Sequence, residues 1–176
     1  MSAQLLFSMQ FTFSLIIFSM VAKWYITPAL NRLPIHSALL PLFLVQALRY
    51  LPSTAFAPGQ VDAKMPMDAM AAIAYGDLAS AILALIAVLF LRYRWVGAIA
   101  AAWLVNSVTS LDWLYAAFLA ASHQLAMYAL GGNWYIINCY VPVIAVIHVM
   151  IFARLIRDHR ARAARSSLAD PRPQVG

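Results

Sequence analysis

Residues 95–121 read WVGAIAAAWLVNSVTSLDWLYAAFLAA, and this stretch decides the class of fold that the chain adopts. It is longer than the roughly 20 apolar residues that a membrane-spanning helix needs. It nevertheless contains an aspartate, Asp112, and four further polar side chains between positions 106 and 110. An ionisable side chain inside such a segment is costly in lipid and normally faces a bundle interior or a cavity. The stretch therefore predicts a membrane helix with one polar face.

The composition of the whole chain agrees with a membrane protein. Of its 176 residues, 64% are hydrophobic and only 10% are charged, and the mean hydropathy is +0.79. A soluble domain carries roughly 25% charged residues, so most of this surface is predicted to face lipid. The single cysteine excludes an intramolecular disulfide and a CxxC metal site.

Apolar segments recur along the chain and predict an all-α, polytopic membrane protein with five transmembrane helices in one domain, residues 1–157. We place the helices at about 4–22, 36–56, 67–91, 95–121 and 133–153. The second segment is the least apolar, because it contains Arg49 and two prolines, Pro41 and Pro52, that can kink or end a helix. We count it because the charge pattern requires an odd number of crossings.

The basic residues alternate between successive connections. Lysines and arginines follow the first, third and fifth segments, whereas the second connection has only Lys64 beside two aspartates and the fourth has no Lys or Arg. The positive-inside rule then predicts an N-terminus outside and a C-terminus in the cytoplasm.

A basic cytoplasmic tail is predicted over residues 158–176. Six arginines lie in it or shortly before it: Arg154, Arg157, Arg160, Arg162, Arg165 and Arg172. Such a cluster anchors topology and can contact anionic lipid. Nucleic acid is not expected as a partner, since no aromatic interleaving or known reader motif accompanies the arginines.

Small side chains recur every four residues on the third and fourth segments. They are Ala72, Gly76, Ser80 and Ala84, followed by Ala98, Ala102, Asn106 and Ser110. Stripes of this kind let membrane helices approach closely. We therefore expect a tight hairpin between the two helices, turning at residues 92–95, RYRW.

Three charged residues lie within predicted membrane helices: Arg49, Asp77 and Asp112. At a rise of about 1.5 Å per residue, each lies about 7–10 residues, or roughly 10–15 Å, from the outer end of its helix. They can therefore meet at one level in the outer half of the membrane. We expect Arg49 to pair with one carboxylate, which leaves the other partly uncompensated. The cluster is interpreted either as a ligand or proton site or as a network that locks the helices.

Other polar residues extend this candidate site. Asn106, Ser110 and Trp113 share one face of the fourth helix, and the fifth helix contributes Asn138 and His148. The complete candidate set for a ligand pocket or helix-locking network is Arg49, Asp77, Asn106, Ser110, Asp112, Trp113, Asn138 and His148. No metal-binding or nucleotide-binding motif occurs, so no metal is expected. A bis-histidine haem would require His36 and His148 to face each other at one depth.

Four blocks of the sequence carry a resemblance to known proteins: ALRYLPSTAFAPG (47–59), AYGDLASAILAL (74–85), NSVTSLDWL (106–114) and VPVIAVIHVMIF (141–152). Together they resemble an uncharacterised family of small polytopic bacterial inner-membrane proteins. The order of an acidic helix, an Asn-bearing helix and a proline-interrupted last helix is also distantly similar to the emopamil-binding (EXPERA) group. That resemblance implies a membrane cavity for a sterol-like or amine-bearing ligand. The chain contains no glutamate, so the acidic residues of the isomerases in that group have no match.

Three functions follow as hypotheses. The first is an integral inner-membrane protein whose intramembrane polar pocket binds a small lipophilic molecule. The second is an accessory or structural subunit of a larger membrane complex, respiratory or photosynthetic. The third is a redox protein that binds haem or quinone through His148.

A transporter is disfavoured because no internal repeat is apparent. No cofactor is predicted and an enzymatic activity is left open. The expected partners are membrane lipids, a lipophilic molecule, and a homo-oligomer or larger complex.

Overall fold

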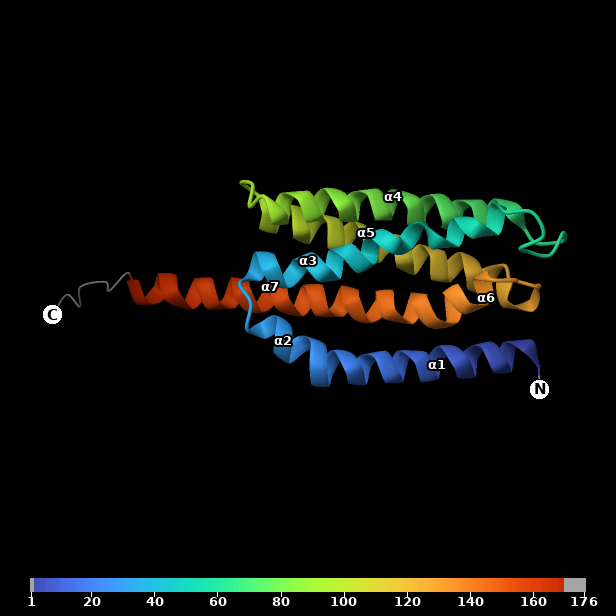
Figure 1. Ribbon diagram of the computed structural model, residues 1–176, viewed down its shortest axis with the longest axis horizontal. Coiled ribbons are helices and arrows are strands. Elements are labelled where there is room, and N and C mark those ends of the chain that lie inside the picture. The colour runs from blue at the N-terminus through green and yellow to red at the C-terminus, as the bar shows by residue number, and fades with distance from the viewer. Residues whose placement is uncertain (1, 170–176) are drawn as a thin grey trace.

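The structure is a computed structural model that describes residues 2–169, and within them the chain is helical without a strand. The helices run along one long axis (Figure 1). In chain order they are α1 (Ala3–Val21), a π-helical turn (Ala22–Ile26), α2 (Thr27–Asn31), α3 (Ile35–Gln46), a 3₁₀ helix (Ala47–Phe56), α4 (Met67–Arg92), α5 (Ala98–Ser122), a 3₁₀ turn (Leu125–Met127), α6 (Asn133–Tyr135), a second π-helical turn (Ile136–Tyr140) and α7 (Val141–Ala169).

Five continuous helical segments in the described part of the chain are long and apolar enough to cross a membrane. They are Ala3–Asn31, Ile35–Phe56, Met67–Arg92, Ala98–Ser122 and Asn133–Ser166. The shortest has 22 residues, which still exceeds the roughly 20 that a bilayer requires. The all-helical class and the number of candidate crossings predicted from the sequence are therefore confirmed.

The first helix is longer than the predicted 4–22. It continues through a π-helical turn into α2 and ends at Asn31. Pro28 lies in the first turn of α2, directly after the π-helical turn. Because proline removes one backbone N–H from the helix, the hydrogen-bond pattern changes there without ending the helix. The charge of Lys23 ends the apolar pattern in the sequence but does not interrupt the backbone.

The second candidate crossing changes its helical geometry half-way. After Gln46 the backbone follows a 3₁₀ helix for ten residues, Ala47–Phe56, with Pro52 inside it. A 3₁₀ helix has three residues per turn, so side chains three apart lie on one face. Gln46, Arg49, Pro52 and Ala55 are all buried at this spacing. The 3₁₀ geometry thus directs an amide and a guanidinium to the same interior face.

α4 and α5 form the largest helix–helix interface in the described residues. The turn between them includes Gly97 with φ +85°, a left-handed conformation that favours glycine. Ala84 and Ala102 are fully buried, as the predicted small-residue hairpin requires. Ala72 differs from the prediction, since it is exposed.

The apolar core lies where α3, α4, α5 and α7 meet. Its fully buried side chains include Leu39, Phe43, Leu91, Ile151 and Leu155. α1 lies outside this core: none of its residues is buried, and it packs mainly along α7. Figure 1 shows α1 as a separate row beside α7.

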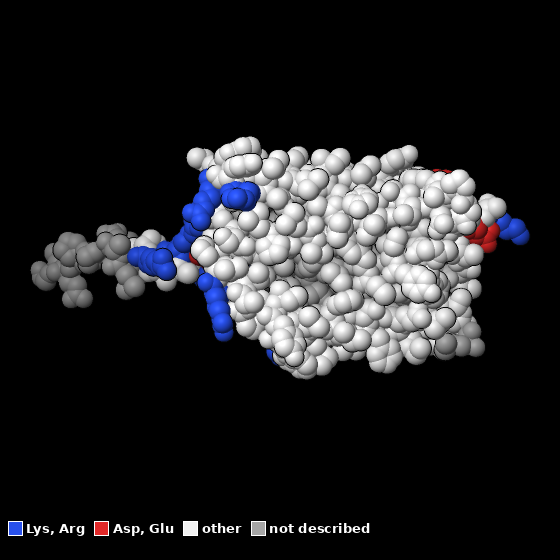
Figure 2. All heavy atoms as spheres, in the orientation of Figure 1, with Lys and Arg blue, Asp and Glu red and all other residues white. Residues whose placement is uncertain are grey.

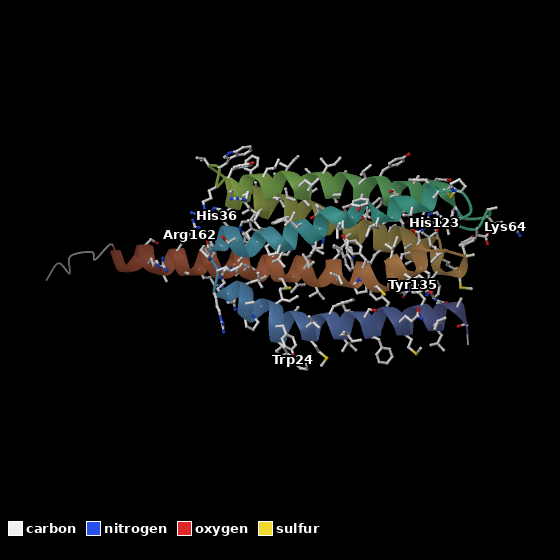
Figure 3. All side chains as sticks on the ribbon, in the orientation of Figure 1. Trp24, His36, Lys64, His123, Tyr135 and Arg162 are labelled. Atoms are coloured by element: carbon white, nitrogen blue, oxygen red, sulfur yellow. The ribbon has the colours of Figure 1, made fainter. Side chains whose placement is uncertain are left out.

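Charged side chains gather at the two ends of the helix bundle. Figure 2 shows lysines and arginines at the end from which α7 projects, a few charged residues at the opposite end, and a broad face without charge between them. Lys64 belongs to the end opposite Arg162 (Figure 3). α1 begins and α7 ends at opposite ends of the molecule (Figure 1).

α7 extends beyond the predicted boundary at 153 and continues to Ala169. The region predicted as a basic tail is therefore helical as far as the structure describes it, while Arg172 lies outside the described residues. Alanine and arginine are strong helix formers. Arg162 also pairs with Asp158 one turn earlier, with 2.7 Å between Nε and Oδ2. These local preferences sustain the helix after its apolar pattern has ended.

Candidate functional site

Arg49 is the centre of a buried polar network and is 1% exposed. Its Nε donates to Oδ1 of Asp77 at 2.8 Å, and its Nη2 donates to the same oxygen at 2.6 Å. Nη2 also donates to Oδ2 of Asp112 at 2.6 Å, and Nη1 donates to the carbonyl of Thr109 at 2.8 Å. One guanidinium on the second crossing therefore joins α4 to α5.

The sequence predicted a pair between Arg49 and one carboxylate, but the structure places Arg49 against both. The reason is the guanidinium fork, whose N–H groups point in different directions and can serve several acceptors. Asp77 comes from α4 and Asp112 from α5, and each is within 2.6 Å of Nη2. The cluster contains two carboxylates and one guanidinium, which leaves one formal negative charge in excess.

Asp112 is the most accessible member of the cluster. Its side chain is 24% exposed, against 12% for Asp77 and 2% for Arg49. Oδ2 also accepts a hydrogen bond from the Ser80 hydroxyl at 2.9 Å. Oδ1 lies against Gly76, where an added Cβ would come within 2.3 Å of it. The glycine on α4 therefore makes the space that the Asp112 carboxylate occupies.

A second polar group lies next to Arg49 and is organised by Gln46, which is fully buried on α3. The Gln46 amide nitrogen donates to Oδ1 of Asn106 at 3.0 Å and lies 3.2 Å from Nδ1 of His148. The Gln46 carbonyl oxygen accepts from the Thr109 hydroxyl at 3.2 Å. This amide therefore connects α3, α5 and α7 in the bundle interior.

His148 brings α7 into the network through Nδ1. That atom lies 2.9 Å from Oδ1 of Asn106 and 2.9 Å from the Ser110 hydroxyl. The ring tautomer decides whether Nδ1 donates to Asn106 or accepts from its other neighbours. Nε2 of His148 is buried and has no hydrogen-bond partner among the described residues. A polar atom in this state can accept or donate one further hydrogen bond.

Two residues of the predicted set do not join the network. Asn138 lies in the π-helical turn before α7, and its amide donates locally to the carbonyl of Trp134 at 2.9 Å. The indole N–H of Trp113 is buried, as is Oδ1 of Asn138, and neither has a partner in the described part of the chain. Trp113 shares the α5 face of Ser110, but its indole N–H makes no hydrogen bond to the cluster within the described residues.

Three contributing residues were absent from the predicted site: Gln46, Ser80 and Thr109. Gln46 carried a signal in the sequence, because it is a polar amide three residues before Arg49 in an apolar segment. A helix places residues three apart on neighbouring positions of one face. Ser80 was expected only as a small packing residue, and its hydroxyl also contacts Asp112.

The structure does not bring the two proposed haem ligands together. His36 is in the first turn of α3, at the end of the bundle that carries Arg162 (Figure 3). His148 contacts Gln46, the last residue of α3. Ten residues of α-helix separate the two levels by about 15 Å, so the two imidazoles do not face each other at one depth.

The network has two chemical properties. It locks four of the membrane-length segments together through charge-assisted and amide hydrogen bonds. With both carboxylates ionised it also carries one formal negative charge in excess, and Asp112 is its more exposed carboxylate. A proton or the cationic group of a bound molecule can balance such a charge in an apolar environment.

Comparison with known protein families finds one match: the family described as "Domain of unknown function (DUF8737)" matches residues 6–156. No curated protein and no solved structure matches the chain. The match agrees with the predicted resemblance to an uncharacterised family. The predicted likeness to the emopamil-binding group has no support in these comparisons.

Proposed function

The chain belongs to this family, and we propose that it is an integral membrane protein that binds a small lipophilic molecule at the Asp112 carboxylate. The proposed location is a bacterial inner membrane, with the N-terminus outside and the C-terminus in the cytoplasm. The charge-poor face between two charged ends of the bundle supports insertion (Figure 2). The arginines at the α7 end support the orientation, because cytoplasmic ends carry the excess of Lys and Arg.

The observation that carries the proposal is a partly exposed carboxylate in the middle of a membrane-length helix. Asp112 is ten residues from the end of α5, or about 15 Å along the helix axis. A carboxylate at this depth is costly unless it is paired or serves a function. Arg49 compensates one negative charge, but the cluster contains two carboxylates. A ligand with a cationic or hydrogen-bond-donating group would supply the missing partner.

The surroundings of Asp112 favour a ligand whose remainder is apolar. Leu111 and Tyr115, its neighbours on α5, are 67% and 55% exposed on the outer surface of the bundle. In a membrane these side chains face hydrocarbon, so a molecule that reaches Asp112 from that side must be soluble in lipid. Binding sites commonly combine an apolar lining with a few polar groups that fix orientation.

The direct test is mass spectrometry of lipophilic molecules that remain with the purified protein. We expect a small molecule with an amine or other donor group to be retained by the wild type and lost from Asp112→Asn. Asparagine keeps an oxygen for Arg49 and Ser80 but removes the charge. The matched control is Asp68→Asn, the same chemical change at an exposed position on α4, which we expect to retain the molecule.

Two results would contradict the proposal. One is a wild-type protein that retains only the bulk lipids of its membrane. The other is equal retention of the small molecule by Asp112→Asn and wild type in samples of the same thermal stability. In either case the buried cluster serves only to lock the helices.

A second candidate function is that of a subunit in a larger membrane complex. It is favoured by α1, none of whose residues is buried and which packs mainly along α7. An apolar helix attached along one side leaves most of its surface for lipid or another protein. Purification in mild detergent separates the candidates: a homogeneous protein that carries a bound small molecule favours ligand binding, and stable association with other subunits favours the complex.

A further inference from the structure

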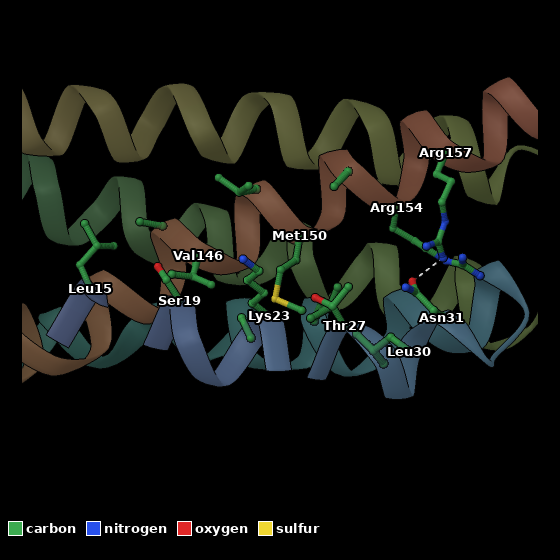
Figure 4. Close-up of a pocket in the computed structure, with 15 residues that line it drawn as sticks. Leu15, Ser19, Lys23, Thr27, Leu30, Asn31, Val146, Met150, Arg154 and Arg157 are labelled. Carbon is green, nitrogen blue, oxygen red and sulfur yellow. Dashed lines mark hydrogen bonds between the residues drawn. The ribbon is translucent and has the colours of Figure 1, made fainter. Parts of the chain in front are cut away.

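A groove of about 540 Å³ lies between the first helix and α7, away from Asp112. Its walls come from α1, the π-helical turn, α2 and α7 (Figure 4), and Leu42 of α3 also lines it. Leu15 and Leu30 line one side, and Val146 and Met150 line the other. Most of the groove is therefore apolar and accommodates a hydrocarbon chain.

Three cations line the same groove: Lys23 from the first helix, and Arg154 and Arg157 from α7. None of the described residues that line it is an aspartate or glutamate. Figure 4 shows the two arginines at one end of the groove, beside Asn31 and Leu30. This is the end of the bundle at which the basic residues gather (Figure 2).

Within the described residues, the two arginines donate hydrogen bonds to uncharged groups. Nη2 of Arg154 donates to the carbonyl of Leu33 at 2.7 Å, and Arg157 donates to the side-chain oxygen of Asn31. Nε of Arg154 is buried and has no acceptor among the described residues. The neighbouring carboxylate on α7, Asp158, is paired instead with Arg162. Neither guanidinium that lines the groove forms a salt bridge with a carboxylate in the described part of the chain, and Arg154 keeps an unused donor.

The spacing of apolar and basic residues suits a molecule with a chain and an anionic head group. From Leu15 to Asn31 the first helix covers 16 residues, or about 24 Å at 1.5 Å per residue. One half of the hydrocarbon core of a bilayer is about 15 Å thick. An acyl chain can therefore lie in the apolar part while its head group remains at the level of the arginines.

We propose that this groove binds an anionic phospholipid, with the phosphate at Arg154 and Arg157, Lys23 farther along the groove on the first helix, and one acyl chain along α1 and α7. Arginine offers planar, multiply donating contacts to phosphate oxygens, and lysine adds a point charge. The site is separate from Asp112 and does not depend on the ligand proposed there. The occupant also fills the space beside α1, so it contributes to the attachment of that helix.

The test uses native mass spectrometry of the full chain released from nanodiscs that contain equal parts of phosphatidylglycerol and phosphatidylcholine. We expect the wild type to retain phosphatidylglycerol in preference to phosphatidylcholine by at least about tenfold, because each cation near an anionic lipid contributes roughly fivefold, or about 1 kcal/mol. The variant Lys23→Gln/Arg154→Gln/Arg157→Gln should lose this preference.

The matched control removes the same number of charges elsewhere on the basic end: Arg160→Gln/Arg162→Gln/Arg165→Gln, three exposed positions on α7. It should keep the preference of the wild type. An equal loss in both triple variants would mean diffuse attraction by the basic end, and would overturn the proposal. Equal retention of both lipids by the wild type would also overturn it.

A second variant tests the apolar half with every cation in place. Val146→Trp fills the groove, and we expect it to release the phospholipid while the protein stays folded by circular dichroism. An excess of inorganic phosphate should not displace the lipid from the wild type, because phosphate lacks the acyl chain. Displacement by phosphate would indicate an anion site without a lipid. Self-association of the wild type that Val146→Trp abolishes, without lipid retention, would indicate that a second copy of the chain fills the groove.

Discussion

Replacing Arg49 with methionine removes the guanidinium and keeps an unbranched, apolar side chain. Four hydrogen bonds disappear with it. Hydrogen bonds between membrane helices contribute about 0.6 kcal/mol each on average, which makes about 2.4 kcal/mol for four. The substitution also leaves Asp77 and Asp112 without their cation, and removing one partner of a buried ion pair costs about 3–5 kcal/mol. We expect the free energy of unfolding to fall by about 3–5 kcal/mol, a range that already includes the lost hydrogen bonds.

The assay is equilibrium unfolding in mixed micelles of a mild detergent and sodium dodecyl sulfate, followed by near-UV circular dichroism. Arg92→Met is the matched control: Arg92 is exposed at the end of α4, and the change should be within about 0.5 kcal/mol of wild type. Arg49→Lys should be intermediate, because it keeps the charge but not the planar fork that reaches several acceptors.

A compensating variant separates the charge from the hydrogen bonds. Adding Asp112→Asn to Arg49→Met removes one uncompensated carboxylate, so the double variant should be more stable than Arg49→Met alone. A loss below about 0.5 kcal/mol for Arg49→Met, the range of ordinary surface substitutions, would refute the inference that Arg49 holds the helices together. Equal stability of the single and double variants would refute the role of the unpaired charge.

Three further outcomes follow from the contacts. Gly76→Ala should lower the free energy of unfolding by about 1–3 kcal/mol in the same micelle titration, because its Cβ would lie 2.3 Å from Oδ1 of Asp112. Gln46→Leu should cost about 1–3 kcal/mol, measured likewise, because it removes two buried hydrogen bonds, to Asn106 and from Thr109, of about 0.5–1.5 kcal/mol each. Trp134→Phe removes the 2.8 Å bond from its indole N–H to Gln10. It should increase amide hydrogen exchange in α1 and leave exchange in α4 unchanged.

The number and class of the helices could be predicted from the sequence because hydropathy is a local sum along the chain. Their ends were less predictable. The first helix continues past Lys23 to Asn31, and the last continues to Ala169. A helix can extend beyond its apolar segment wherever the residues favour helical structure, because its backbone hydrogen bonds do not require an apolar environment. Hydropathy therefore does not predict where such a helix ends. The meeting of Arg49 with two carboxylates was partly predictable, because a fixed helical rise gives an approximate depth for each residue.

The sequence did not predict how many partners Arg49 has, nor the role of Gln46. Both depend on the 3₁₀ helix that replaces the α-helix after Gln46. This change turns Gln46 and Arg49 toward one interior face and lengthens the segment between them and Phe56. Proline at position 52 indicated an irregular helix, but its geometry depends on packing against α4, with which this 3₁₀ segment makes its most extensive contacts.

The sequence by itself determined an apolar, helical chain with basic residues at one end and three charges within its apolar segments. Hydrophobicity and charge are properties of single residues, and helical rise is a property of a regular backbone. All three can therefore be predicted from the linear sequence. Only the tertiary structure decided that Arg49 joins both aspartates, that Gly76 makes room for Asp112, and that α1 and α7 leave a groove lined by cations. Those features depend on which faces of distant segments come within a few ångströms of each other, because hydrogen bonds and close packing have short range.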